Sequence, residues 1–234
     1  MYSVSKVFRA ALAVLGFSGA TLPLMAQENI AEIHFSDIDN NLYETEIREA
    51  SRLGFISGFP DGTFRPDFEI TREQIVAMTL AFANGLTDNG FPVSPARGHV
   101  FSDVERSRWS ADRIETAFSV GLVSGYPDGS FKPARRISRA ELMTIMYNAS
   151  AILSERVLGS VVFDRFPVPE HPFTDTDSHW AAKSIATMYG MCHVASPLNE
   201  QGDQYFADRA ATRAYAAAAI VRAFNCLSAI FGGR

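Results

Sequence analysis

The sequence of 234 residues has few cysteines and only a small excess of charge of one sign. Its formal net charge of −5 gives no general attraction to nucleic acid or anionic lipid, so a bound polyanion would need local basic residues. Hydrophobic residues make up 47% and charged residues 20%, which argues against a disordered or fibrous chain. No nucleophile elbow, phosphate loop or pair of catalytic carboxylates stands out, so we predict that the protein is not an enzyme.

Metal-binding patterns are also missing from the sequence. The histidines have no metal-ligand spacing; they are His34, His99, His171, His179 and His193. The acidic run that begins at Asp37 resembles the start of a calcium loop, but it lacks the glycine and the closing glutamate at the proper offsets. We therefore expect neither a metal site nor a cofactor.

The apolar run at the N-terminus is too short for a typical membrane-spanning helix. Residues 10–24 are almost wholly apolar and follow Lys6 and Arg9, whereas a spanning helix needs roughly 20 apolar residues. Residues 1–26 are therefore interpreted as a secretory signal peptide that is cut before Gln27, with an uncleaved anchor as the alternative. We expect an exported chain without a transmembrane segment after cleavage, located in the periplasm or in the cell wall and outer envelope.

Only two cysteines are present, Cys192 and Cys226. In an oxidising compartment they could form a disulfide, whereas in a reducing compartment they would be two small buried hydrophobic residues. Because the chain carries an export signal, we favour the disulfide.

The sequence does contain an internal repeat, which is the first feature to seek in a chain of this size. Residues 54–66 and 121–133 match nearly residue for residue, and each segment is preceded by a Phe-Ser-Asp triplet. A third unit keeps a Phe-Thr-Asp triplet at 173–175 and a Thr-Arg pair at 212–213, but its middle has changed. We predict three repeats, at residues 33–84, 99–154 and 171–228.

Each repeat is predicted to form a helix, a loop and a second helix, so the expected fold class is all-α. Gly54 and Gly121 follow the first helix, where a left-handed C-cap needs glycine. The second helix opens with a capping box in the first two repeats, Thr71 with Gln74 and Ser138 with Glu141. The second helices are expected over residues 72–83, 139–153 and 213–227, and their wide apolar faces favour burial against one another.

The loop and helix start together resemble the S-layer homology (SLH) repeat. The motif appears as Ile70-Thr71-Arg72-Glu73-Gln74, Ile137-Ser138-Arg139-Ala140-Glu141 and Ala211-Thr212-Arg213-Ala214-Tyr215, each after an aromatic and turn-rich loop. The resemblance implies three SLH repeats in a pseudo-threefold arrangement around a central helix bundle. It also implies noncovalent binding of a cell-wall polysaccharide, often one with an acidic ketal, or of peptidoglycan and its attached glycans.

The third repeat is also similar to the SLH segment of cyanobacterial outer-membrane porins, in the residues around Cys192 and Cys226. This similarity leaves a second interpretation open, in which a porin-related envelope protein acts through envelope protein partners. A rival from another class is a wall-active enzyme with its site in residues 154–172, a segment that has few candidate groups.

The family resemblance implies that Arg72, Arg139 and Arg213 bind the ligand. An arginine in the first turn of a helix lies beside the positive end of the helix dipole, which is unfavourable for stability. The same place suits an anion site that combines a guanidinium with free backbone N–H groups. Pairing with an aspartate of a neighbouring repeat is the structural alternative. Because the first two repeats are intact, we favour Arg72 and Arg139 over Arg213.

Aromatic and acidic residues complete the candidate site. Trp109 and Trp180 occupy equivalent positions and could either stack on a sugar ring or pack in the core. Asp37, Asp103 and Asp175 are equivalent as well, and could either bind sugar hydroxyls or cap the helix that follows.

Overall fold

The computed structural model describes residues 34–87, 90–95, 98 and 100–232, so the predicted signal peptide and His99 lie outside the described residues. The described residues form helices without a β-strand, which confirms the all-α class. The α-helices are α1 (Glu44–Arg52), α2 (Arg72–Leu86), α3 (Ala111–Ser119), α4 (Arg139–Leu158), α5 (Ala182–Gly190) and α6 (Arg213–Phe231). Two short 3₁₀ helices, η1 (Val162–Arg165) and η2 (Leu198–Glu200), lie in the segments between them.

The long helices α2, α4 and α6 begin where the capping pattern predicts. Thr71 accepts a hydrogen bond from the backbone of Gln74, and the Gln74 side chain accepts one from the backbone of Thr71. The same box is present at the start of α4, and α6 keeps the hydroxyl cap alone. All three helices end three to five residues later than predicted. In α4 the added turn carries Arg156, which donates to the carbonyl of Gly90 at 3.0 Å.

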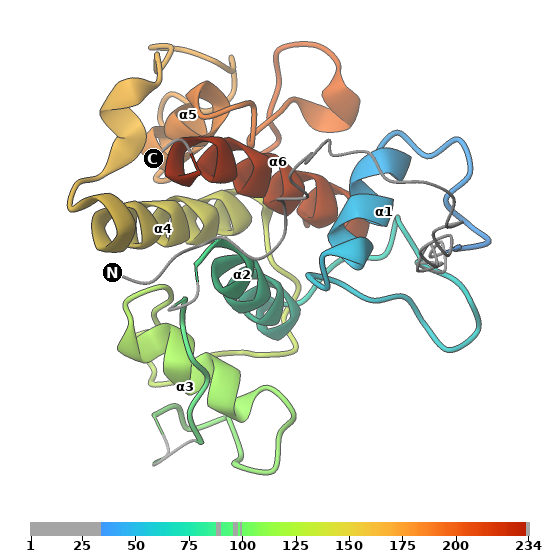
Figure 1. Cartoon of the computed structure of the whole chain (residues 1–234), viewed down its shortest axis with the longest axis vertical. Helices are drawn as coiled ribbons and strands as arrows, with labels where there is room; N and C mark the ends of the chain where they lie inside the picture. Colours follow the sequence, from blue (N-terminus) through green and yellow to red (C-terminus); the bar gives the residue numbers. More distant parts are fainter. Residues whose placement is uncertain (1–33, 88–89, 96–97, 99, 233–234) are drawn as a thin grey trace, which may run out of the picture. The chain divides into compact units, whose positions relative to one another are not determined.

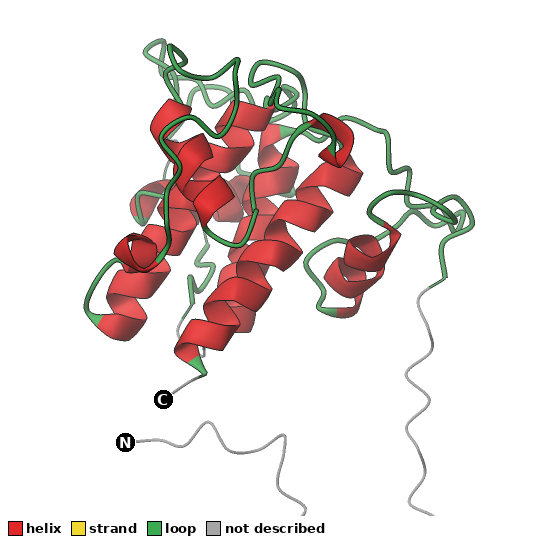
Figure 2. Ribbon diagram, turned by 90° about the horizontal axis from the view of Figure 1, so that it is seen from above, coloured by secondary structure: helices red, strands yellow, loops and turns green. Residues whose placement is uncertain are grey.

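We keep the word repeat for each of the three segments predicted from the sequence, of which the first two contain α1 to α4 and the third contains α5 and α6. Each short helix packs on the long helix of the preceding segment. In Figure 1, α2, α4 and α6 lie together, while α1, α3 and α5 lie further out. The contacts pair α3 with α2, α5 with α4, and α1 with α6, so the last repeat packs against the first. Figure 2 shows the loops gathered around one end of these helices. The repeats therefore interlock in a closed cycle.

A ring of backbone hydrogen bonds joins the three repeats beside the N-terminal ends of the long helices. The amide of Ile70 donates to the carbonyl of Ala211 at 2.9 Å. Ala211 donates to Ile137 at 2.9 Å, and Ile137 donates to Ile70 at 3.0 Å. All three residues are fully buried, so these bonds are shielded from water. The ring fixes the position of the first turn of each long helix relative to the next repeat. The motif arginine lies in this first turn, so its position is fixed as well.

The third repeat carries the Cys192–Cys226 disulfide, which confirms the predicted pairing. Cys192 has a φ of +52°, in the left-handed region that Gly54 (+73°) and Gly121 (+79°) occupy in the other repeats. The third repeat thus keeps this backbone conformation without the glycine, and the disulfide ties the loop to α6.

Among the described helices, α6 alone has the length and composition of a membrane span. In this fold 61% of its most apolar window is buried, mainly through alanine side chains that let its neighbours approach closely. This burial among the other helices marks α6 as a core helix of the fold.

Candidate functional site

The three motif arginines are buried, and each reaches across to the following repeat. The exposed fractions are 7% for Arg72, 2% for Arg139 and 6% for Arg213. Each Nε donates to the carbonyl of the loop aromatic in the next repeat: Arg72 to Phe131, Arg139 to Tyr205, and Arg213 to Phe64, at 3.0, 2.8 and 2.9 Å. Each Nη2 donates to a serine carbonyl of the same loop: Ser124, Ser196 and Ser57, respectively. The arginines therefore link the cycle of repeats.

Arg213 keeps its positive charge inside this environment. Burial, with Arg65 nearby, lowers the pKa of Arg213 to about 10, which leaves it protonated at neutral pH. Burial also lowers the pKa of Arg72, whose Nη1 lies 3.4 Å from Glu141. The partners found for these arginines are main-chain carbonyls and this glutamate, not the aspartates that we considered.

A groove of about 670 Å³, which we call groove 1, lies between the first repeat and α3 of the second. Its wall includes Arg213 from the third repeat, and Trp109 lies at its edge with 54% of its surface exposed. The other lining residues include Phe55, Ile56, Ser57, Gly58, Gln74, Ala77, Met78, Ala81 and Arg113.

A smaller groove of about 210 Å³, groove 2, lies at the equivalent place one repeat later. Arg72 takes the position of Arg213, and Trp180, which is 65% exposed, takes the position of Trp109. Apart from Tyr126, the remaining lining residues have counterparts in the lining of groove 1; they are Leu122, Val123, Ser124, Gly125, Glu141, Thr144, Ile145 and Asn148. Two junctions between repeats therefore have the same design: a buried arginine, a serine–glycine loop and an exposed tryptophan.

Side chains bridge the junction of the third repeat with the first, among them the rings of Tyr43 and Tyr215. Arg139 lies under the ring of Tyr215, 3.8 Å from its centroid. Arg222 bridges the junction, with Nη2 at 3.1 Å from Glu46 and Nη1 at 3.0 Å from Glu200. We call Glu46, Arg222 and Glu200 the seam. The sequence favoured Arg72 and Arg139 as ligand residues, whereas in the structure Arg72 and Arg213 line the two grooves. Each arginine binds the loop of the repeat that follows it, so Arg213 lies at the groove of the first repeat and Arg72 at the groove of the second.

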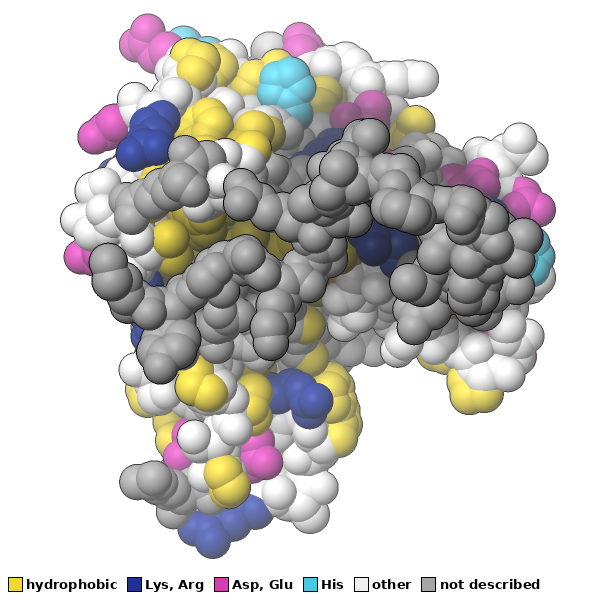
Figure 3. All heavy atoms as spheres, viewed as in Figure 1, with side chains coloured by type: hydrophobic (Ala, Val, Ile, Leu, Met, Phe, Trp, Pro, Cys, Tyr) yellow, Lys and Arg dark blue, Asp and Glu magenta, His cyan; other side chains and the backbone are white. Residues whose placement is uncertain are grey.

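The two tryptophans are exposed, so core packing is the wrong alternative for them. Figure 3 shows hydrophobic and basic side chains exposed together over α3, the helix that follows Trp109. Arg113 donates to the carbonyl of Trp109 at 3.1 Å and lies over its ring at 5.8 Å from the centroid. Sequence reasoning missed Arg113, although a spacing of four residues from Trp109 on a helix could have indicated it.

The three aspartates do not cap the helices that follow them, so that interpretation is wrong. Helix α1 begins only at Glu44, and none of the short helices α1, α3 and α5 has a side-chain cap. Asp37 instead accepts from the backbone amides of Phe64 and Arg65, both at 2.7 Å. Asp103 and Asp175 bind the equivalent loops in the same way.

This carboxylate fork explains an unusual backbone conformation. To aim two consecutive amides at one carboxylate, the second residue adopts a left-handed conformation, with φ of +58° at Arg65, +57° at Lys132 and +56° at Phe206. Each aspartate thus ties the start of its repeat to the end of the loop. Both carboxylate oxygens are engaged in this way, which favours a structural role over sugar binding.

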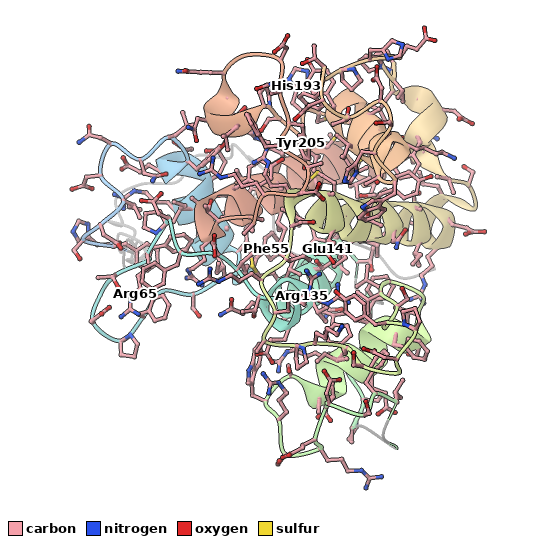
Figure 4. All side chains as sticks on the ribbon, turned by 180° about the vertical axis from the view of Figure 1, so that it is seen from behind. Phe55, Arg65, Arg135, Glu141, His193 and Tyr205 are labelled. Atoms are coloured by element: carbon pink, nitrogen blue, oxygen red, sulfur yellow. A yellow bond between two sulfur atoms is a disulfide. The ribbon has the colours of Figure 1, made fainter. Side chains whose placement is uncertain are left out.

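Other chemistry in the described residues is sparse. Within the described part of the chain no group of three or more His, Cys, Asp and Glu residues could hold a metal ion. Figure 4 shows Arg135 beside Glu141 at the start of α4, where they form an ion pair. In the same view Tyr205 lies inward near α6, while His193 lies at the outer edge of the third repeat.

In a comparison with known families, the matched segments lie within the first two repeats. Residues 34–76 and 100–143 match the S-layer homology domain. The chain is 29% identical over 193 residues, 80% of its length, to a cellulosome-anchoring protein of Acetivibrio thermocellus, of which it covers 39%. It is 33% identical over 120 residues to cell surface glycoprotein 1 of the same organism, covering 49% of the chain and 5% of that protein.

A third relative is the middle cell wall protein of Brevibacillus brevis, with 27% identity over 147 residues, 62% of the chain and 14% of that protein. The chain thus spans less than two fifths of the length of these curated relatives. The matched segments contain the loops of grooves 1 and 2 and the first five residues of α2 and of α4.

Proposed function

We propose that this protein binds a cell-wall polysaccharide or peptidoglycan noncovalently in grooves 1 and 2, and so attaches itself to the cell envelope. The observation that carries the proposal is the repeated design of the two grooves, each with an exposed tryptophan and a buried cation. The matches to the SLH domain and the similarity to a cellulosome-anchoring protein and a cell wall protein support an envelope location. Export to the periplasm or to the outer envelope remains part of the proposal.

The chemistry of the grooves suits a sugar polymer with acidic substituents. An exposed indole face offers a flat apolar surface for the C–H side of a sugar ring. A buried guanidinium is already stripped of most of its water, so it interacts strongly with a carboxylate that enters the groove. In groove 1 Arg113 adds a second cation, whereas in groove 2 Glu141 accompanies Arg72. We therefore expect groove 1 to prefer an acidic unit more strongly than groove 2 does.

We propose that Arg213 and Trp109 contact ligand in groove 1, and Arg72 and Trp180 in groove 2. Arg139, together with Asp37, Asp103 and Asp175, is assigned to holding the fold. The third segment is proposed as a diverged SLH repeat in a pseudo-threefold arrangement. The equivalent arginine, aspartate and N-cap contacts and the closed hydrogen-bond ring support this assignment.

A second candidate function is that of a porin-related envelope protein which acts through protein partners. The observation that favours it is a cavity of about 790 Å³ between α5 and residues 161–172, outside grooves 1 and 2. Its wall holds the stacked rings of Tyr147 and Phe163, with centroids 4.5 Å apart. His171 contacts Asp177 at 2.9 Å there, and a catalytic use of that pair, as a wall-active enzyme, is the weakest alternative.

The test is cosedimentation with purified native walls. Trp109→Ala and Trp180→Ala are expected to weaken binding, because each removes a stacking surface worth roughly 1 kcal/mol or more. Leu42→Ala is the matched control, because Leu42 holds the equivalent position in the first repeat, at the junction that Arg222 bridges, and is 55% exposed. The proposal fails if the wild-type protein does not bind walls, or if the double tryptophan variant binds as well as the Leu42 control.

A further inference from the structure

Trp109 lies between two residues that hold the same buried carboxylate. Glu73, the residue after Arg72 on α2, has a side chain that is 8% exposed. Its two oxygens accept hydrogen bonds from Nε and Nη2 of Arg108, both at 2.8 Å. Ser110 donates its hydroxyl to Oε2 of Glu73 at 2.5 Å. The loop of the second repeat is thus fastened to the long helix of the first on both sides of Trp109.

The electrostatics of this cluster keep it ionised. Burial alone would raise the pKa of Glu73, but hydrogen bonds from Arg108 and Ser110, together with the positive charge of Arg108, outweigh burial and lower the pKa below its ordinary value of 4.5. The same carboxylate raises the pKa of Arg108. A bidentate pair between a guanidinium and a carboxylate fixes both position and orientation, which a single hydrogen bond does not. Trp109 stands between these two partners of Glu73 in the sequence, so the position of its backbone is coupled to this pair.

The equivalent cluster is missing one repeat later. Ala140 stands in place of Glu73, His179 in place of Arg108, and Ala181 in place of Ser110. His179 Nε2 lies 3.3 Å from Oδ1 of Asp208, whose side chain is 90% exposed. Trp180, between His179 and Ala181, is accordingly held near groove 2 without a buried ion pair to the preceding long helix.

We propose that Glu73, Arg108 and Ser110 form a clamp that fixes Trp109 at the edge of groove 1 and makes groove 1 the tighter of the two sites. This inference rests on the proposed function for its effect on affinity, but the fixing of Trp109 stands independently of any ligand. An aromatic side chain that is already ordered loses less freedom when a ligand stacks on it. The three clamp residues act through Trp109 and are positioning residues.

The chain has two tryptophans, so the Trp180→Phe background leaves Trp109 as the reporter. In that background Glu73→Ala is expected to increase the mobility of the indole in time-resolved fluorescence anisotropy without ligand. It should also weaken binding to native walls by roughly three- to ten-fold. Glu73→Ala copies the residue of the next repeat, and circular dichroism reports whether the fold persists. The control is Asp208→Ala in the Trp109→Phe background, which should leave the mobility of Trp180 unchanged.

Unchanged mobility of Trp109 in the Glu73→Ala variant would overturn the clamp, whatever the wall binding shows. Greater mobility with unaltered wall binding would overturn its role in affinity, provided that Trp109→Ala itself weakens binding. If Trp109→Ala has no effect on binding, the proposed function fails at groove 1, while the anisotropy still decides whether the clamp fixes Trp109.

Discussion

At the scale of single residues, one arginine position has two uses. Each motif arginine donates hydrogen bonds to loop carbonyls of the next repeat. These bonds stabilise the fold, because a buried carbonyl without a donor is costly. Only Arg72 and Arg213 also line the grooves described here, whereas Arg139 is covered by tyrosine rings. We therefore expect stability and binding to separate among these equivalent residues.

The first prediction concerns this separation. Arg139→Ala and Arg213→Ala should each destabilise the fold by about 2 to 4 kcal/mol, because each leaves two carbonyls without donors and a void beside an aromatic ring. Urea unfolding measures this loss. At temperatures where both variants are folded, wall binding should fall for Arg213→Ala and stay near the wild-type level for Arg139→Ala. Equal loss of binding in both would contradict the assignment.

The second prediction concerns the aspartate forks. Asp103→Asn keeps the size of the side chain but removes its charge, and its amide nitrogen cannot accept from the second of the two backbone amides. We expect a loss of about 1 to 3 kcal/mol in the free energy of unfolding. Thermal unfolding followed by circular dichroism measures it. Ser102→Ala is the control, since Ser102 is exposed and its hydroxyl makes a long hydrogen bond of 3.3 Å.

The third prediction is a dependence of stability on pH that belongs to Glu73. Its pKa is lower in the folded chain than in the unfolded chain, so the unfolded state binds the proton more readily. The stabilisation is fully present above the unfolded pKa and is lost as pH falls from about 5 through the lower folded value. Urea midpoints across this range should therefore fall less steeply in Glu73→Gln than in the wild type. Parallel curves for the two proteins would exclude this contribution.

At the scale of helices, the caps decide where the long helices start. Ser138 both caps α4 and opens its capping box, so Ser138→Ala should cost about 1 kcal/mol in thermal or urea unfolding. Thr212→Ala should cost less, because α6 has the hydroxyl cap without the reciprocal side chain of a box. A larger effect at Thr212 than at Ser138 would count against this account of the helix starts.

Much of this helical scaffold is predictable from local sequence, and the limits are physical. Caps and turns depend on residues three or four apart, so Thr71, Ser138 and Gly54 indicate their elements directly. The role of Asp37 depends on amides 27 and 28 residues away, and local sequence suggested a helix cap instead. Helix ends depend on tertiary contacts such as that of Arg156.

The candidate site was predictable in its residue types and less so in its pairing. The sequence singled out the tryptophans and arginines, but it gives no information on which arginine meets which tryptophan. That pairing follows from the cyclic order, in which Arg213 crosses to the first repeat and meets the groove edged by Trp109. The positions of Arg108 and Ser110, on either side of Trp109, also depend on Glu73, a residue from another repeat.

At the scale of the whole molecule, within the part that the structure describes, the cycle of repeats closes where the third repeat meets the first. The packing of α1 on α6, the seam and the disulfide all lie there or in the adjoining third repeat. The disulfide closes a loop with a sequence separation of 34 residues, so it restricts the unfolded chain considerably. We interpret this junction as the contact that closes the cycle of repeats and so maintains the arrangement of grooves 1 and 2.

A prediction at this scale concerns the disulfide. The Cys192→Ala and Cys226→Ala double variant should lose about 3 to 4 kcal/mol of stability, the amount expected for closing a loop of this length. Urea unfolding under non-reducing conditions, with the reduced wild type beside it, measures the loss. Wall binding by the folded variant should remain, because the disulfide lies outside grooves 1 and 2. Loss of binding with an intact fold would mean that the third junction takes part in recognition.

The central claim is that the two exposed tryptophans mark the sites where the wall polymer binds. Each tryptophan gives one indole N–H signal in a nitrogen–proton correlation spectrum, so two signals report on two grooves. Wall fragments released by muramidase from native walls are titrated into the labelled protein. Both indole signals should shift in a saturable manner, and the signal assigned to Trp109 should saturate at the lower fragment concentration. If the fragments bind while both signals stay in place, or if they do not bind at all, the claim is contradicted.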